Sequence, residues 1–221
     1  MGYMKETDYL MNETEIMYRQ TDIWKIFRYN AFTLSQKNMW NYGGTPFSNN
    51  ASLRWQSMTM NRYEWDVKET FAWNWLDSRL LRGGPDVRFG SYFLTSAKFN
   101  TDKAKRMMFM LKYEGDHNFE GNRFNTISPS LTFRLGNHVY LSGQLDYAWN
   151  TDEMQYVATT SPLSSSSLAP YYYVMGHMDQ KTYGLTLKLQ VNVTPDISIQ
   201  FYGAPFTSCL LYTSDAADDG E

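Results

Sequence analysis

The sequence predicts an all-β protein: an antiparallel up-and-down meander of about ten long strands, forming a partial, incompletely closed transmembrane β-barrel. Apolar and polar residues alternate over long stretches, aromatic residues make up 17% of the chain, and the expected connections alternate between short and long. Mean hydropathy is only −0.52, and no stretch approaches the roughly 18 apolar residues of a membrane helix. A barrel wall explains how a chain with so many aromatic residues can have a low mean hydropathy, because lipid-facing apolar residues alternate there with polar lumen-facing ones.

The alternation is clearest near the C-terminus. Apolar and polar residues alternate strictly over 185–193, Thr194-Pro195-Asp196 forms a turn signal, and the alternation resumes over 197–201. This pattern predicts a β-hairpin with one apolar and one polar face. A second hairpin is predicted around Gly136-Asn137, which is a two-residue turn signal. A soluble sheet would show the same alternation, so this pattern does not decide between membrane and water.

Strand and connection lengths favour the membrane. The strands expected from this pattern are 23–36, 51–61, 64–77, 86–99, 104–114, 123–135, 138–150, 172–193 and 197–206, with one or two weaker strands before residue 20. Short connections are expected at 61–62, 100–102, 136–137 and 194–196, and longer ones at 37–50, 78–85, 115–122 and 151–171. Soluble strands average about 5–6 residues, and outer-membrane barrels combine long strands with short periplasmic turns and longer external loops.

Aromatic residues gather near the ends of the expected strands. Examples are Trp24 and Phe27, Trp40 and Tyr42, Tyr63 and Trp65, Trp73 and Trp75, Tyr147 and Trp149, and Tyr171 to Tyr173. Such rings prefer the boundary between hydrocarbon and water and form girdles there. The competing interpretation is a platform that stacks on sugar rings, but the recurrence at strand ends along the whole chain favours girdles.

Strand parity predicts a truncated barrel. If the short turns are periplasmic, the strand 197–206 runs outward, and an even-stranded barrel then needs another strand after Phe206. Residues 209–221 are acidic at their end and lack alternation. We therefore expect a partial barrel domain over 1–208 and a disordered tail over 209–221 that is not native to the domain.

Charge and cysteine content exclude several classes of function. The net charge is −3, the pI is about 5.6, and no basic stripe is present, so no nucleic-acid partner is expected. Cys209 is the single cysteine, so no intrachain disulfide can form. The first residues lack the apolar core of a signal peptide. Since an outer-membrane protein needs such a signal, either the chain is a fragment of a longer precursor or the barrel interpretation is wrong.

No catalytic, cofactor-binding or metal site is predicted, and we expect no cofactor and no enzymatic activity. His117, expected in a loop, His138, beside a turn, and His177 each lack a second histidine or cysteine at metal-ligand spacing. A glycosidase needs two carboxylates facing each other across a cleft, and the sequence places no such pair. The scattered carboxylates considered are Glu64, Asp66, Glu69, Glu114, Asp116, Asp152 and Glu153.

The segment Leu81-Arg82-Gly83-Gly84-Pro85 predicts a specific loop conformation. It is not a phosphate-binding loop, because it lacks the Gly-Lys-Ser/Thr sequence and a following helix pattern. Two glycines permit positive φ, and Pro85 removes a hydrogen-bond donor where the next strand begins. The alternative is that Arg82 contacts a substrate or a lipid head group.

Three segments carry a family resemblance. Residues 173–206, together with Leu81 to Pro85 and the weaker Trp40-Asn41-Tyr42-Gly43-Gly44, resemble a C-terminal β-barrel domain of unknown function from large Gram-negative outer-membrane proteins. In those proteins the domain follows a carbohydrate-binding family-9-like module. The resemblance covers most of 1–208. It implies an outer-membrane location without established chemistry, with lipid as partner and a carbohydrate or peptide ligand held by the absent upstream module.

The resulting functional hypothesis is an outer-membrane scaffold or conduit for that upstream module. The alternative is a soluble β-sandwich that binds carbohydrate through surface aromatics. The sandwich predicts two packed sheets, whereas the barrel predicts one continuous meander.

Overall fold

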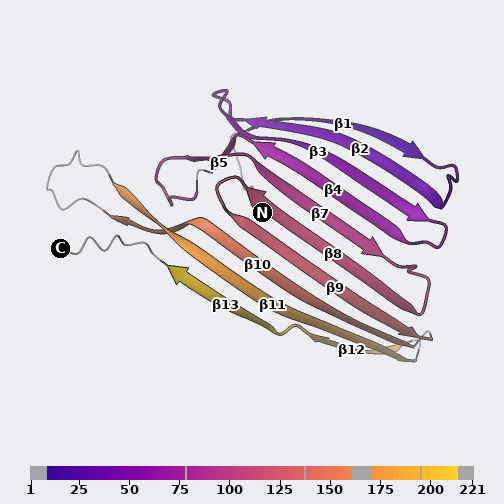
Figure 1. The fold of residues 1–221 in the computed structure, drawn as a ribbon. Helices are drawn as coiled ribbons and strands as arrows, with labels where there is room; N and C mark the ends of the chain where they lie inside the picture. The colour runs from indigo at the N-terminus through magenta and orange to yellow at the C-terminus, as the bar shows by residue number, and fades with distance from the viewer. Residues whose placement is uncertain (1–8, 78, 137, 161–170, 195, 214–221) are drawn as a thin grey trace.

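A computed structural model describes residues 9–77, 79–136, 138–160, 171–194 and 196–213 of the 221-residue chain. Figure 1 shows these residues as one large curved sheet whose strands follow one another in chain order. In the described ranges, no helix has the length and apolar character needed to cross a membrane.

The sheet is an antiparallel meander. Its strands are β1 (Leu10–Gln20), β2 (Phe27–Trp40), β3 (Pro46–Thr59), β4 (Glu64–Trp73), β7 (Tyr92–Asn100), β8 (Met107–Asn118), β9 (Arg123–Leu135), β10 (Val139–Thr160), β11 (Tyr172–Thr194), β12 (Ile197–Gly203) and β13 (Phe206–Thr213). Each strand pairs with its neighbour in this order, except that β12 and β13 both pair with β11. The short strands β5 (Trp75–Asp77) and β6 (Val87–Phe89) form a separate hairpin between β4 and β7.

The sheet is not closed. In the described part of the chain, β1 pairs only with β2, while β12 and β13 pair only with β11. The expected all-β meander and its incomplete closure are therefore confirmed. The soluble β-sandwich is wrong as an architecture, because the long strands form one sheet and not two packed ones.

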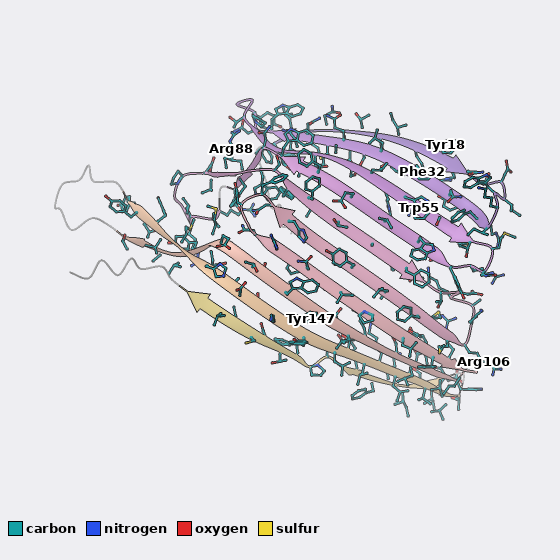
Figure 2. The ribbon with its side chains drawn as sticks, viewed as in Figure 1. Tyr18, Phe32, Trp55, Arg88, Arg106 and Tyr147 are labelled. Carbon is teal, nitrogen blue, oxygen red and sulfur yellow. The ribbon has the colours of Figure 1, made fainter. Side chains whose placement is uncertain are left out.

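The register divides the sheet into an apolar and a polar face. Residues directly opposite each other in neighbouring strands share a face. One such row contains Tyr18, Phe32 and Trp55 of β1, β2 and β3, which are labelled in Figure 2. Further apolar-face residues are Ile16, Leu34, Leu53, Val67, Phe99, Leu111, Leu131, Leu141, Leu185, Leu187 and Phe201. Many of them are well exposed, for example Leu34 at 54% and Leu53 at 56%.

The charged residues of the strands concentrate on the polar face. That face carries Glu15, Arg54, Asp66, Lys68, Lys98, Lys112, Glu114, Asp146 and Lys188. These charges are partly paired: Arg54 donates to both carboxylate oxygens of Asp66, and Lys112 pairs with Glu114 at 2.7 Å. Soluble sheets bury their apolar face against a second layer. Here no second layer of the described residues covers the apolar face, and the ion pairs lie on the polar face.

Polar residues on the apolar face pair with each other. The Glu69 carboxylate accepts a hydrogen bond from the Thr95 hydroxyl at 2.7 Å, and both lie on this face. Asn125 accepts from the Tyr113 hydroxyl at 2.7 Å and lies 2.8 Å from Nε2 of His117. Pairing lowers the cost of removing such groups from water. The alternation in sequence did not foresee these pairs, because they join different strands.

The connections at the two ends of the sheet differ less in length than expected. One end, the turn end, consists of 21–26, 60–63, 101–106, 136 and 138. The other end, the loop end, contains 41–45, 74–77, 79–91 and 119–122. Long connections were expected at 37–50 and 115–122, but the flanking strands extend into both, so these expectations are wrong. The long segment 74–91 does lie at the loop end. The expected serine-rich loop falls at 161–170, outside the described residues.

β11 has the bounds expected from the sequence to within one residue, whereas β10, expected to end at 150, continues to Thr160. β10 and β11 continue past the ends of β8 and β9 (Figure 1), because each supplies the other with a pairing partner. The expected strand 64–77 breaks at Asn74, whose φ is +55°, and asparagine adopts this region more readily than most residues. Residues from Cys209 onward were expected to lack structure, but Cys209–Thr213 belong to β13, which pairs with β11.

Candidate functional site

The β5–β6 hairpin folds over the loop end of the polar face. It leaves the sheet after β4 and returns at β7, while its tip reaches the extensions of β10 and β11. At that tip, the Arg82 guanidinium lies 5.2 Å from the ring centre of Tyr156. A Cβ on Gly84 would lie 2.6 Å from the Tyr173 hydroxyl. The hairpin therefore spans the ends of β8 and β9.

The hairpin tip forms a tight turn, but of its two glycines only Gly83 has the positive φ that the sequence suggested, and the other positive φ is at Arg82. Arg82 and Gly83 have φ values of +47° and +102°, Leu81 is buried, and backbone hydrogen bonds join Arg82 to Arg79 and Gly84 to Leu81. Glycine adopts positive φ without cost, and the absence of a Cβ at Gly84 admits the Tyr173 ring. Arg82 contacts an aromatic ring of the chain itself.

A cavity of about 280 Å³ lies between this hairpin and the sheet. Trp75 and Phe89 of the hairpin form one wall, and these two residues are paired in the β5–β6 register. Asp116, Phe124 and Asn150 line the opposite side. The register places these three residues side by side on β8, β9 and β10, on the polar face.

The cavity combines aromatic rings with polar groups that lack protein partners. Trp75 packs edge-on against Tyr92, with ring centres 5.6 Å apart and an interplanar angle of 80°. Among the described residues, the Tyr92 hydroxyl, the Asp116 carboxylate and the Asn150 amide have no hydrogen-bond partner. Apolar walls with a few convergent polar groups are typical of small-molecule sites.

A larger cavity of about 580 Å³ lies at the turn end. It is bounded by three connections and is lined by Arg28, Arg62, Glu64 and Lys103. The Lys103 ammonium pairs with the Glu64 carboxylate at 2.5 Å. Its walls come from exposed turns, and its charges are partly compensated, so the cavity at the loop end is the stronger candidate.

The three histidines lie far apart in the sheet. His117 was expected in a loop, but it is in β8 and contacts Asn125 on the apolar face. His138 lies beside a turn as expected, with Nδ1 3.1 Å from the Asn192 carbonyl oxygen. His177 lies on β11. Within the described ranges, no group of three or more His, Cys, Asp or Glu side chains is arranged so that it could hold a metal ion.

The carboxylates fall into separate environments. Asp66 and Glu114 are paired with basic residues on the polar face, whereas Glu69 lies on the apolar face. Asp116 and Asp152 both line the cavity at the loop end. Asp152 and Glu153 were expected in a loop, but both belong to β10. The sequence missed the grouping of Asp116 with Trp75 and Asn150, because it depends on the folding back of the hairpin.

Two carboxylates hold His177 beyond the ends of β8 and β9. Its Nδ1 lies 2.9 Å from Glu153 and its Nε2 lies 3.2 Å from Asp179. The Glu153 hydrogen bond, followed by that of Asp179, raises the pKa of His177 above its usual value. Because the pKa of His177 is higher in the folded chain, its contacts with the two carboxylates stabilise the fold. This stabilisation is fully present below about pH 6.5, the pKa of histidine in an unfolded chain. It is lost as the pH rises through the folded-state pKa.

We expect Glu153→Gln to lower the pKa of His177, because the substitution removes the carboxylate that contributes most. An NMR titration of the imidazole in the wild-type and variant chains measures this shift. Lys112→Gln is the control, since Lys112 pairs with Glu114 on another strand. An unchanged His177 titration in Glu153→Gln would show that the contact does not form in solution.

Comparison with known proteins gives one family match. A family model described as "Domain of unknown function (DUF5916)" matches residues 1–218. The match extends past Ser208, where the resemblance was expected to stop. No curated protein and no solved structure matches the chain significantly.

Proposed function

This chain belongs to the DUF5916 family of domains of unknown function, and we propose that it forms part of the wall of an outer-membrane β-barrel. The observation that carries the proposal is the separation of the two faces across the whole sheet. On the inner stretches of the strands, Glu69 and Lys181 are the two charged residues of the apolar face in the described ranges, and the register places them in one row across the sheet. An apolar surface of this extent needs a nonpolar environment, and lipid supplies one.

The height of the apolar surface fits a bilayer. On β10 it runs from Val139 to Trp149, where Tyr147 stacks on Trp149 and on Tyr183. Ten steps of about 3.3 Å give about 33 Å along the strand, and a tilt of about 40° reduces this to about 25 Å. Outer-membrane barrels have an apolar band of about 25 Å between aromatic girdles.

Aromatic contacts occur at both ends of this surface. Near the turn end, Trp65 lies 4.4 Å from Phe99 and Trp24 lies 6.3 Å from Phe27, measured between ring centres. Near the loop end, Phe71 contacts Trp73 and Phe93. Two aromatic zones separated by aliphatic residues support the girdle interpretation over a sugar platform on this face.

The unpaired sheet edges point to further strands. Lipid cannot satisfy the free backbone groups of β1, β12 and β13, so a membrane sheet must close. We propose that these edges pair with strands outside the described residues. In the completed barrel the polar face lines the interior, and the domain serves as a non-catalytic scaffold or conduit. The module it would serve is the carbohydrate-binding one that the family resemblance implies.

Spin labels at adjacent positions test the membrane orientation. In a Cys209→Ser background, Leu53→Cys and Leu187→Cys place labels on the apolar face, and Ser52→Cys and Lys188→Cys place them on the polar face. In lipid vesicles we expect oxygen, which dissolves in lipid, to relax the first pair preferentially. A water-soluble nickel chelate should relax the second pair. Equal access of the chelate to both pairs would contradict the proposal.

A further inference from the structure

The cavity under the β5–β6 hairpin contains hydrogen-bonding groups of both kinds. The Asp116 carboxylate accepts, the Tyr92 hydroxyl donates or accepts, and the Asn150 amide does both. These three groups are unpaired within the described residues. Each costs free energy if water is removed without replacement, so a ligand that binds there must both donate and accept.

The aromatic walls require that the same ligand also has an apolar side. Trp75 and Phe89 face the cavity from the hairpin and Phe124 lines it from the sheet. Phe124 is 44% exposed and Trp75 is 38% exposed, so their rings remain available for contact. A sugar ring has this dual character, because its C–H face stacks on aromatic rings while its hydroxyl groups donate and accept hydrogen bonds.

The hydrogen-bond donors in the cavity favour a neutral ligand over a cation. A cation would use the carboxylates of Asp116 and Asp152, but it would leave the donors of Tyr92 and Asn150 unused. Vicinal hydroxyl groups satisfy both the donors and the acceptors of this cavity.

We propose that this cavity binds one neutral pyranose unit of a glycan. The volume of about 280 Å³ is slightly below the range of about 300–1,000 Å³ that is typical of ligand sites, and so suits a single ring. Trp75 and Phe89 stack on its C–H face. Asp116, Asn150 and Tyr92 hydrogen-bond to its hydroxyl groups. This proposal goes beyond the barrel function and does not require the sheet to lie in lipid.

Binding is measured on the full chain in detergent micelles, with a panel of neutral methyl pyranosides and their oligosaccharides, by saturation-transfer NMR and calorimetry. We expect saturable binding of at least one pyranoside, unchanged between low and high salt, since a neutral ligand is not screened. Trp75→Ala should weaken this binding at least tenfold. Trp65→Ala is the matched control, because Trp65 is similarly exposed, at 40% against 38%, but lies on the apolar face.

Tyr92→Phe provides a test that leaves the packing intact. The substitution removes only the hydroxyl, and the loss of one hydrogen bond should weaken pyranoside binding about three- to tenfold. This variant decides the outcome if Trp75→Ala does not fold, as judged by circular dichroism. Unchanged affinity in Tyr92→Phe would overturn the proposed contacts.

Three other results would overturn the proposal. The first is no saturable binding of any pyranoside to the folded chain. The second is preferential, salt-sensitive binding of alkylamines or lysine peptides, which would identify a cation site. The third is equal weakening by Trp65→Ala and Trp75→Ala, which would show nonspecific binding to aromatic surfaces. Because binding is measured in micelles and orientation in vesicles, the two proposals can fail independently.

Discussion

Leu131→Arg is expected to destabilise the folded chain in lipid vesicles by about 2–4 kcal/mol, the cost of a lipid-facing cation near the middle of a bilayer. Leu131 lies near the middle of the apolar face of β9, opposite Phe109 and Gly143. The guanidinium would replace an aliphatic group in hydrocarbon, where nothing can hydrogen-bond to it. The unfolding free energy in vesicles, measured by urea titration, gives the effect.

Ser130→Arg is the matched control for this prediction. Ser130 is the preceding residue of β9 and faces the polar side, opposite Met110 and Gln144. An arginine there remains in contact with water and polar side chains, so we expect a change below about 1 kcal/mol, as for most exposed substitutions. Equal destabilisation by the two arginines would rule out a lipid-facing apolar surface on β9.

Gly84→Val is expected to release the hairpin tip from the β10–β11 extension. A Cβ at this position would lie 2.6 Å from the Tyr173 hydroxyl and 2.7 Å from two of its ring carbons. Forcing extra volume into such a contact costs about 1–3 kcal/mol. Trypsin can cleave after Arg79 and Arg82 in the tip and after Arg88 in β6. Limited trypsin digestion therefore measures the release of the tip, and we expect faster cleavage within 79–88.

The double variant Gly84→Val with Tyr173→Ala tests the cause of that release. Removing the Tyr173 ring clears the space that the valine needs, so the double variant should be cleaved more slowly than Gly84→Val alone. Gly143→Ala is the control for a glycine substitution, since its Cβ would meet only Leu187 at an ordinary 3.5 Å. Cleavage that is as fast in the double variant would show that the Tyr173 contact does not hold the tip.

The sequence identified the faces of the strands better than their lengths. The alternation over 131–135 and 185–193 assigned the apolar side correctly, because side chains of a strand alternate between faces. Strand ends were less accurate, since a strand continues as long as a neighbour can pair with it. β10 continues to Thr160 because β11 pairs with it, and β13 forms because the edge of β11 is available to it.

The candidate pocket could not be predicted from the sequence. Trp75, Asp116 and Asn150 are separated by long stretches of chain, and none belongs to a recognisable motif. Leu81 to Pro85 did predict an unusual loop, but not its contact with Tyr156 and Tyr173. That contact depends on the extension of β10 and β11 beyond their neighbours.

The sequence by itself determined an antiparallel β-meander with one apolar and one polar face, because alternation and turn residues are local properties of the chain. Only the tertiary structure decided that Glu69 pairs with Thr95 on the apolar face and that the β5–β6 hairpin folds over the polar face. These features depend on which strands become neighbours and in what register, and contacts between distant residues leave no periodic signal in the sequence.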